Sequence, residues 1–352
     1  MSESQTFPAN IQLEYLNEGA ANIVYRIIIP KSLLQGTKDE RHRGLFPPSV
    51  IEFSDASREK LAFCNKLLRL RKDLTTTNPV RLSQSNWLQF IAPLFHPSEL
   101  VQQSLVTIKS SGIVQRLNKE LVESERSTSN LYNHRAKIRH GVYLADEDYG
   151  LLVTNMTSNI KFNTVVEFKP KWLVQSLSAP SNSLRCRQCA RNAFLNAELV
   201  ASNEPPDSHI FCPLDFFSED PNTLNHLAKQ ILSHKADNVC LLRFVEWIKN
   251  VSLLRRLREI QIQFDRAGVL NADPSDKNFL TAMTLRDCTV FVRLAHNEDK
   301  IEARLGDLDL KSPAKLSYWK KIECQLIDGG WYNNTEHPAH KQPNNCFLNR
   351  KF

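Results

Sequence analysis

The chain has 352 residues, of which 41% are hydrophobic and 24% are charged, a balance typical of a globular protein large enough for two lobes. No apolar run approaches the roughly 18 residues that a membrane span requires, and residues 1–10 lack the pattern of a secretory signal. We therefore expect an intracellular protein whose eight cysteines are free thiols. The net charge of +7 is spread over short basic clusters, without the aromatic interleaving of a nucleic-acid platform, which favours a small polyanion as the partner.

The patterns predict a β-rich start to the chain, followed by helices. In chain order we expect a strand at 11–15, a turn at 17–22, a strand at 23–29, a surface loop at 30–48, a third strand at 66–72 and mostly helical structure from 83 to about 133. The second half is mixed. It predicts strands at 150–156 and 165–171, helices near 222–232, 239–264 and 277–285, and a strand at 289–294. This order indicates an α+β, two-lobed kinase-like fold with an N-terminal lobe at 1–150 and a C-terminal lobe at 151–352.

Two lysines separated by one proline are the most informative feature of the sequence. Lys169 and Lys171 follow a β-prone run, and residues two apart in a strand point to the same face. Two ammonium groups held together repel each other unless an anion lies between them, which points to a phosphate-rich ligand. The alternative is a solvated face of an exposed strand.

Acidic residues supply the second chemical signal. Asp307, Asp309 and Lys311 alternate with leucines, so in a strand they would share one face, and two carboxylates beside ATP could hold Mg²⁺. Asp287 precedes a buried strand and could orient the acceptor hydroxyl and take its proton. A surface strand with alternating charges and an ordinary turn aspartate are the respective alternatives.

Small residues between the first two predicted strands could let backbone N–H groups approach a triphosphate, although an ordinary hairpin turn fits the segment equally well. Arg69 on the next strand could reach the same phosphates or could simply be solvated. The C-x-x-C pair Cys186 and Cys189 has no second C-x-x-C or histidine cluster to complete a metal site. Buried packing is the preferred interpretation of this pair, with a metal site and a redox pair as alternatives.

Seven segments occur together in the order of one known family. They are E-G-A-A-N-I-V-Y from Glu18, L-R-L from Leu68, E-F-K-P-K from Glu167, C-R-Q-C from Cys186, P-L-D-F-F-S from Pro213, R-D-C-T from Arg286 and D-L-D-L-K from Asp307. On these segments the chain resembles the inositol-pentakisphosphate 2-kinases, in particular their fungal branch. The resemblance implies an enzyme that transfers the γ-phosphoryl group of ATP to the 2-hydroxyl of inositol pentakisphosphate to make phytate, with ATP and Mg²⁺ as cofactors.

The resemblance also implies roles for individual residues. Nucleotide contacts fall on Glu18, Gly19, Ala20, Ala21, Asn22, Arg69 and Glu167. Metal binding falls on Asp307 and Asp309, and catalysis on Asp287 and Lys169. Substrate contacts fall on Lys169, Lys171, Arg187, Arg191, Asn238, Lys311, Lys315 and Trp319, with Tyr318 as an alternative to Trp319. The resemblance further implies a nuclear or cytoplasmic location, and we expect a monomer that binds neither nucleic acid nor membrane.

The sequence departs from plant relatives in the expected substrate shell. Those relatives carry a histidine or similar polar group where Arg191 aligns and a lysine where Leu195 aligns. Their zinc cluster also has no counterpart at 270–283, which contains no cysteine or histidine. Another small-molecule kinase of similar architecture and a non-catalytic inositol-phosphate-binding protein remain the alternative functions.

Overall fold

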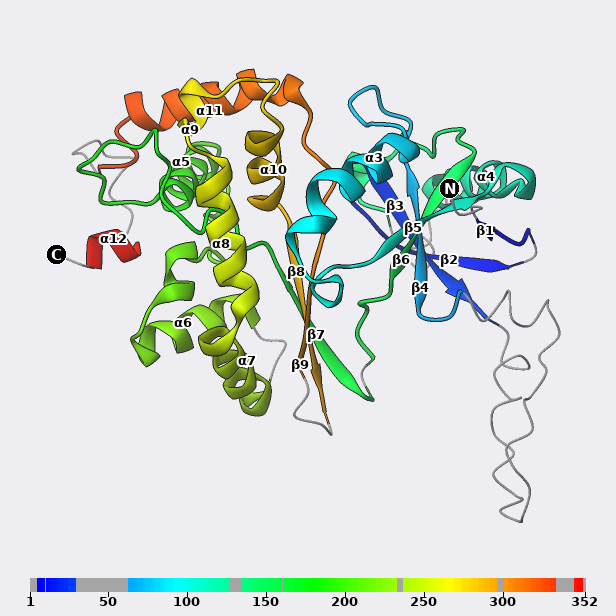
Figure 1. Ribbon diagram of the computed structural model, residues 1–352, viewed down its shortest axis with the longest axis horizontal. Helices are drawn as coiled ribbons and strands as arrows, with labels where there is room; N and C mark the ends of the chain where they lie inside the picture. The colour runs from blue at the N-terminus through cyan, green and yellow to red at the C-terminus, as the bar shows by residue number, and fades with distance from the viewer. Residues whose placement is uncertain are drawn as a thin grey trace, which may run out of the picture. The chain divides into compact units, whose positions relative to one another are not determined.

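The computed structural model describes residues 5–9, 11–29, 63–126, 135–159, 161–232, 237–296, 301–333 and 345–350 (Figure 1). The chain divides into two compact units, Met1–Ser85 with Val101–Asn155 and Asn86–Leu100 with Met156–Phe352. Both units combine a largely antiparallel sheet with helices, which is an α+β fold. The predicted loop at 30–48 lies outside the described residues. Within the described part, no helix combines the length and apolar character that crossing a membrane would require.

The first unit is built on a six-stranded sheet with the order β1-β5-β6-β4-β3-β2. Only the β1–β5 pair is parallel. The strands are β1 (Gln5–Thr6), β2 (Gln12–Glu18), β3 (Asn22–Ile28), β4 (Lys66–Arg71), β5 (Gln103–Thr107) and β6 (Tyr149–Thr154). Among the described residues of this unit, the α-helices are α3 (Val80–Asn86), which ends at the boundary of the unit, and α4 (Ile113–Arg126).

Alternating burial explains why these segments form a sheet. In β3 the side chains of Ile23, Tyr25 and Ile27 are buried, while the residues between them are half-buried. The same hydrophobic cluster contains Ile113 and Leu117, which lie one helical turn apart on α4. The predicted strands at 11–15, 23–29 and 66–72 are therefore confirmed with small shifts at their ends.

The second unit contains a three-stranded antiparallel sheet with the order β7-β8-β9. Its strands are β7 (Asn163–Phe168), β8 (Thr289–Ala295) and β9 (Ile301–Gly306). Its helices are α5 (Arg187–Ala201), α6 (Pro221–Leu232), α7 (Asn238–Asn250), α8 (Ser252–Phe264), α9 (Gly268–Asn271), α10 (Lys277–Leu285), α11 (Leu316–Asp328) and α12 (Phe347–Arg350). Shorter turns include η2 (Trp87–Ile91), η3 (Ala92–Leu94), η4 (Pro97–Glu99), η7 (Pro213–Phe217) and η8 (Pro313–Lys315).

The core of the second unit lies between its sheet and its helices. Val290, Val292 and Leu294 of β8 are fully buried, and their cluster includes Phe244 of α7 and Leu257 of α8. Figure 1 shows α6 and α7 beside this sheet, and both helices contact it, α6 at β7 and α7 at β8. The predicted strand at 289–294 and helix at 277–285 are confirmed.

Several predictions of secondary structure were incomplete or wrong. The region at 83–133 is mostly helical up to Arg126, as predicted, but it also contains strand β5, which forms because it pairs with β6 and β1. Residues 127–133 lie outside the described residues. The predicted helix at 239–264 is two helices, α7 and α8, because Val251 has an extended backbone (φ −72°, ψ 116°). Strand β9 and helix α11 were missed. Residues 86–100, which the sequence placed in the N-terminal lobe, belong to the second unit.

Candidate active site

The register of the second sheet brings three separate segments to one end. Phe168, the last residue of β7, pairs with Val290 near the start of β8, and Thr289 pairs with Gly306, the last residue of β9. The residues that follow β7, precede β8 and follow β9 therefore meet at the same end of the sheet. These are the segments that carry Lys169, Asp287 and Asp307.

Helix α10 and a buried ion pair fix the backbone around Asp287. Helix α10 ends at Leu285, and the Asp287 N–H donates a hydrogen bond of 3.0 Å to the Thr284 carbonyl. The preceding residue, Arg286, is buried and forms an ion pair of 2.7 Å with the buried carboxylate of Asp265 on the helical side. Because Arg286 is held in the core, Asp287 lies at the end of the sheet, where its side chain is 40% exposed.

Three ammonium groups converge on the Asp287 carboxylate. Lys311 Nζ lies 2.6 Å from Oδ2, Lys171 Nζ lies 3.0 Å from Oδ1, and Lys169 Nζ lies 3.5 Å from Oδ1. Lys169 Nζ also donates to the Asp287 backbone carbonyl at 2.6 Å. Burial disfavours ionisation of Asp287, but the ammonium groups of Lys311, Lys171 and Lys169 outweigh burial and hold its pKa well below the usual range.

Lys171 reaches this position through a backbone conformation that was not predicted. Strand β7 ends at Phe168. Lys171 has a φ of 59°, in the left-handed region that residues other than glycine rarely adopt. The fully buried side chain of Gln261 on α8 fixes this conformation, because its amide donates to the Lys171 carbonyl and accepts from the Leu173 N–H, each at 3.0 Å. The expected convergence of Lys169 and Lys171 is present, but the explanation by strand alternation was wrong.

The segment from Asp307 to Lys311 is also not a strand. Asp307 has φ 55° and directly follows the end of β9. Leu308 and Leu310 are buried, as the alternation predicted, and the Lys311 N–H donates to the buried Thr284 hydroxyl of α10 at 3.0 Å. The coil is thus held by its leucines and by α10 instead of by a ladder of strand hydrogen bonds.

Asp307 and Lys315 complete the cluster of charges, which we call the Asp287 cluster: Lys169, Lys171, Asp287, Asp307, Lys311 and Lys315. Asp307 Oδ2 accepts a hydrogen bond of 2.8 Å from Lys169 Nζ, and its side chain is 53% exposed. Burial opposes the charge on Lys169, but Asp307 and Asp287 outweigh it and raise the pKa of Lys169. Burial and the charge of Lys311 lower the pKa of Lys315. Asp309, which lies between Asp307 and Lys311 in the chain, is half-buried.

Arg187 stands apart from these lysines. Its Nε forms an ion pair of 2.9 Å with the fully buried carboxylate of Glu323 on α11, and its guanidinium lies 4.1 Å from the centre of the Trp172 ring. The Arg286 guanidinium lies 3.6 Å from the centre of the same ring. Trp172 directly follows Lys171 in the chain, and Arg286 directly precedes Asp287. The Trp172 ring therefore links Arg187 to the backbone segments that carry Lys171 and Asp287.

The other expected substrate residues lie in different surroundings. Arg191, one turn further along α5, has its guanidinium 5.2 Å from the centre of the Phe194 ring. Trp319 is buried in an apolar cluster, edge-to-face with Phe279 at 6.0 Å, whereas Tyr318 is 54% exposed. Asn238 is exposed in the first turn of α7, and within the described residues no hydrogen bond or ion pair joins it to the Asp287 cluster.

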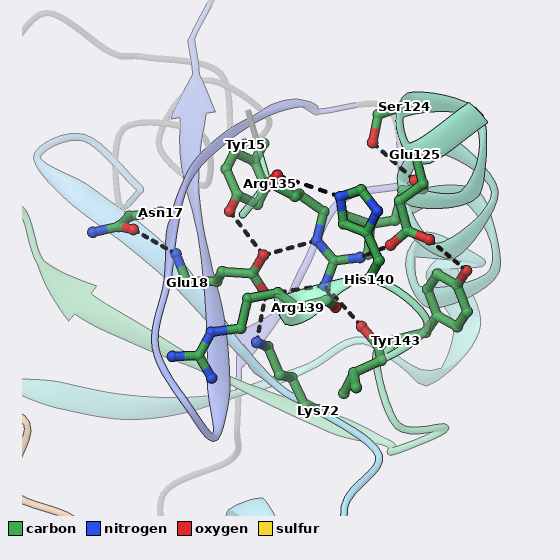
Figure 2. Close-up of polar contacts among 12 residues, drawn as sticks. Tyr15, Asn17, Glu18, Lys72, Ser124, Glu125, Arg135, Arg139, His140 and Tyr143 are labelled. Atoms are coloured by element: carbon green, nitrogen blue, oxygen red, sulfur yellow. Dashed lines mark hydrogen bonds and ion pairs between the residues drawn. The ribbon is translucent and has the colours of Figure 1, made fainter. Parts of the chain in front are cut away.

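The small-residue loop of the first unit connects β2 to β3. Figure 2 shows that the preceding Glu18 points into a network of cations instead of toward solvent. Its carboxylate is 4% exposed, forms an ion pair with Lys72, and accepts from Arg135 at 2.8 and 3.0 Å. Burial opposes its ionisation, but Arg135 and Lys72 outweigh burial and lower the pKa of Glu18 to about 2.

Lys72 also holds the loop itself. Its Nζ donates to the Gly19 carbonyl at 2.8 Å, and its backbone N–H donates to the Ala21 carbonyl at 2.9 Å. A methyl group added at Gly19 would meet no atom within 4 Å. The fold of this unit therefore does not itself require glycine at this position. Arg69 lies on β4, where it pairs with Val24 of β3.

The sequence profile of the inositol-pentakisphosphate 2-kinases matches residues 15–325. The chain belongs to this family. Similar proteins named inositol-pentakisphosphate 2-kinase come from Yarrowia lipolytica, at 34% identity over 52% of this chain and 56% of the relative, and from Candida glabrata, at 27% over 46% and 53%. A third, from Kluyveromyces lactis, is 28% identical over 46% of this chain and 48% of the relative. The matched part is thus about half the length of these curated relatives.

Sequence reasoning missed the supports of the site. Gln261 on α8, Asp265 directly after α8 and Glu323 on α11 are buried polar residues, and each is bound to a backbone group or a cation of another segment. Their signal in the sequence is slight, a polar residue on an otherwise apolar helix face. Only the fold identifies the partner of each one.

Proposed function

We propose that this protein transfers the γ-phosphoryl group of ATP to the 2-hydroxyl of inositol pentakisphosphate. The convergence of Lys169, Lys171 and Lys311 on Asp287 is the observation that carries the proposal. A polyphosphorylated ring needs several cations to replace its hydration, and an acceptor hydroxyl needs a carboxylate within hydrogen-bond reach. The Asp287 cluster offers both kinds of group within one small region.

The proposed reaction uses the competition between substrate and Asp287 for the same lysines. Phosphate groups of the bound substrate take over the ammonium groups, so the pKa of Asp287 rises toward its ordinary range and the carboxylate becomes a better proton acceptor. The 2-oxygen then forms a bond to the γ-phosphorus, the bond to the bridging oxygen breaks, and ADP leaves with that electron pair. Asp287 receives the hydroxyl proton, while Lys169 stabilises the transferred group.

Mg²⁺ is proposed to bind at Asp307, with Asp309 as a second ligand. Magnesium prefers carboxylate oxygens and retains several waters, which suits the half-exposed Asp307 carboxylate. Bound there, the ion would neutralise charge on the nucleotide phosphates. Lys169, which contacts both Asp307 and Asp287, would then stand between the metal-binding and base residues.

ATP is proposed to contact the loop from Gly19 to Asn22, with Arg69 near its phosphates and Glu167 near its ribose or base. The surrounding protein leaves room for a side chain at position 19, so close approach of a ligand to the backbone is the proposed reason for the glycine. Glu18 is better assigned to holding this loop, because Lys72 and Arg135 occupy its carboxylate. We further propose that the two units correspond to the two lobes of a kinase-like fold.

The outer substrate shell is proposed to include Lys315, Arg187, Arg191 and Asn238. The position of Lys315 close to Lys311 and Asp287 supports its inclusion. Arg187 would act from its pair with Glu323, and one buried nitrogen of Arg191 has no hydrogen-bond partner within the described residues. Tyr318 is a better candidate for an aromatic contact than Trp319, because Trp319 is packed in the core.

The decisive experiment is to incubate pure protein with Mg-ATP and a panel of inositol phosphates, and to separate the products by anion exchange. We expect inositol pentakisphosphate with a free 2-hydroxyl to be converted to the hexakisphosphate, with one ADP formed per product. Turnover of a different alcohol alone would indicate another small-molecule kinase. Binding of the pentakisphosphate without any turnover would indicate a non-catalytic binding protein, and either outcome would overturn the proposal.

A further inference from the structure

Lys171 is the residue of the Asp287 cluster whose backbone conformation is least expected for its type. Among the described residues, four other than glycine have a positive φ: Asn65, Lys171, Asn203 and Asp307. Asparagine and aspartate adopt this left-handed region comparatively readily, because their short polar side chains can bond to the nearby backbone. Lysine has no such compensation. A strained backbone of this kind persists only where its surroundings hold it, and such residues collect at functional sites.

Gln261 supplies the contacts that hold this conformation. Its side chain is fully buried on α8, where the other buried residues are leucines and an isoleucine. A buried amide is costly unless it is hydrogen-bonded, and both ends of this one bind the main chain of a single turn. Its Nε2 donates to the Lys171 carbonyl and its Oε1 accepts from the Leu173 N–H, each at 3.0 Å. Pro170 has no N–H to offer a continued ladder with β8, so these bonds to α8 take its place.

The residue after Lys171 is anchored independently of Gln261. Trp172 is buried, and the centre of its ring lies 4.1 Å from the Arg187 guanidinium and 3.6 Å from the Arg286 guanidinium. These contacts hold the Trp172 side chain, but they do not fix the direction of the Lys171 carbonyl. Loss of the Gln261 amide should therefore release the backbone of Lys171 while the packing of Trp172 stays in place.

We propose that Gln261 is a positioning residue for substrate binding, which holds Lys171 in the conformation that directs its ammonium group to a substrate phosphate. That ammonium group lies 3.0 Å from Asp287 Oδ1, and the Lys171 side chain is 33% exposed, so a phosphate can reach it from solvent. Lys169 contacts Asp307 directly, so we expect Gln261 to affect substrate binding more than turnover. The effect on substrate rests on the proposed function, whereas the placement of Lys171 by Gln261 does not.

The first test is Gln261→Met, which keeps the length of the side chain and removes both hydrogen bonds. We expect the Kd and the KM for inositol pentakisphosphate to rise roughly tenfold or more, while kcat and the KM for ATP change by less than about threefold. Gln263→Met is the matched control, because Gln263 is exposed on the same helix, and it should behave as wild type. Unchanged substrate affinity in Gln261→Met, or a loss confined to kcat, would overturn the proposal.

Combination with Lys171→Met separates positioning from a general loss of stability. If Gln261 acts through Lys171, it has no ammonium group left to position in Lys171→Met. Adding Gln261→Met to that variant should therefore change the Kd for inositol pentakisphosphate by less than about twofold. Losses that multiply in the double variant would show that Gln261 acts by another route, and the proposal would be wrong.

A further measurement needs no substrate. Mass spectrometry follows the acylation of individual lysines in the folded protein. In Gln261→Met, Lys171 should react roughly threefold faster or more, because an ammonium group released from Asp287 is more accessible to the reagent. Lys311, whose backbone N–H is bound to α10, should react at the wild-type rate. An unchanged rate at Lys171, or equal increases at both lysines, would overturn the proposal.

A second variant covers the case in which Gln261→Met does not fold. Gln261→Asn keeps a polar side chain on α8, but its amide is one methylene shorter and cannot span both partners, so the same difference between Lys171 and Lys311 is expected. Because acylation uses no inositol phosphate, its result stands apart from the kinase assay. A protein that neither binds nor phosphorylates inositol pentakisphosphate would contradict the proposed function, and the rates at the two lysines would still decide whether Gln261 places Lys171.

Discussion

Lys311 Nζ lies 2.6 Å from Asp287 Oδ2, and the two residues are held by the same helix. Asp287 follows the end of α10, while the Lys311 backbone N–H donates to Thr284 within that helix. The proposed base and one of its competing cations therefore share a single support.

Replacement of Asp287 by asparagine should separate chemistry from binding. We expect turnover to fall by roughly 10²-fold or more, because the amide cannot take the hydroxyl proton, while the KM values for ATP and inositol phosphate change by a few-fold. Steady-state kinetics measures both quantities. Asp273→Asn, at an exposed turn before α10, is the control and should behave as wild type. Wild-type turnover in Asp287→Asn would remove this residue from the role of base.

Replacement of either lysine after β7 by methionine should weaken the handling of phosphate. The expected loss is about 1.5 to 3 kcal/mol per charged contact, or roughly ten- to a hundred-fold in kcat/KM. Lys169 contacts both Asp287 and Asp307, so Lys169→Met should lower kcat, whereas Lys171→Met should mainly raise the KM for inositol phosphate. Lys229→Met, on the exposed side of α6, is the control. Unchanged kinetics in two stable variants would mean that the pair is only a solvated surface.

Removal of the charge of Asp307 should affect metal dependence. Asparagine is the suitable replacement, because it tolerates the left-handed φ of 55° at this position better than alanine does. Asp307→Asn should raise the Mg²⁺ concentration needed for half-maximal turnover by roughly tenfold or more and leave the Kd for inositol phosphate within a few-fold. Magnesium titrations and calorimetry would measure the two effects. A collapse of substrate affinity with an unchanged response to Mg²⁺ would contradict the assignment.

Glu18 should contribute to stability in a pH-dependent way. Its folded pKa of about 2 lies below the ordinary value of 4.5, so its contribution is complete above about pH 4.5 and is lost as the pH falls toward 2. Glu18→Gln leaves Lys72 and Arg135 buried without this counter-charge, and should lower the free energy of unfolding by about 3–5 kcal/mol at neutral pH. Urea titrations at several pH values should show the difference from wild type shrinking below pH 4.5.

Glu14→Gln provides the matched control for that experiment. Glu14 and Arg26 form an ion pair on the same hairpin, but their side chains are 56% and 42% exposed. We expect a change of less than about 1 kcal/mol for this variant. Equal effects of Glu14→Gln and Glu18→Gln would show that burial of the Glu18 network does not contribute to stability.

The contrast between Lys171 and Gln261 shows what the sequence can and cannot predict. The chemical demand for an anion between two lysines is local, so Lys169 and Lys171 could be selected from their spacing alone. The geometry depends on a buried glutamine 90 residues away, whose partner only the folded chain defines. Cys346 is a similar case, because it contacts Cys212 across 134 residues of sequence. Strand β9 is another, because its strand conformation depends on pairing with β8.

The ladder of β7, β8 and β9 has two ends with different constraints. Its Phe168 end carries the Asp287 cluster, whereas the connection from β8 to β9 lies at the Ala295 end, five residue pairs along the register from Val290 to Ala295. The pairs near Asn163 and Ala295 are therefore the part of this ladder in which the sequence could change with the least effect on the groups proposed to carry out phosphoryl transfer.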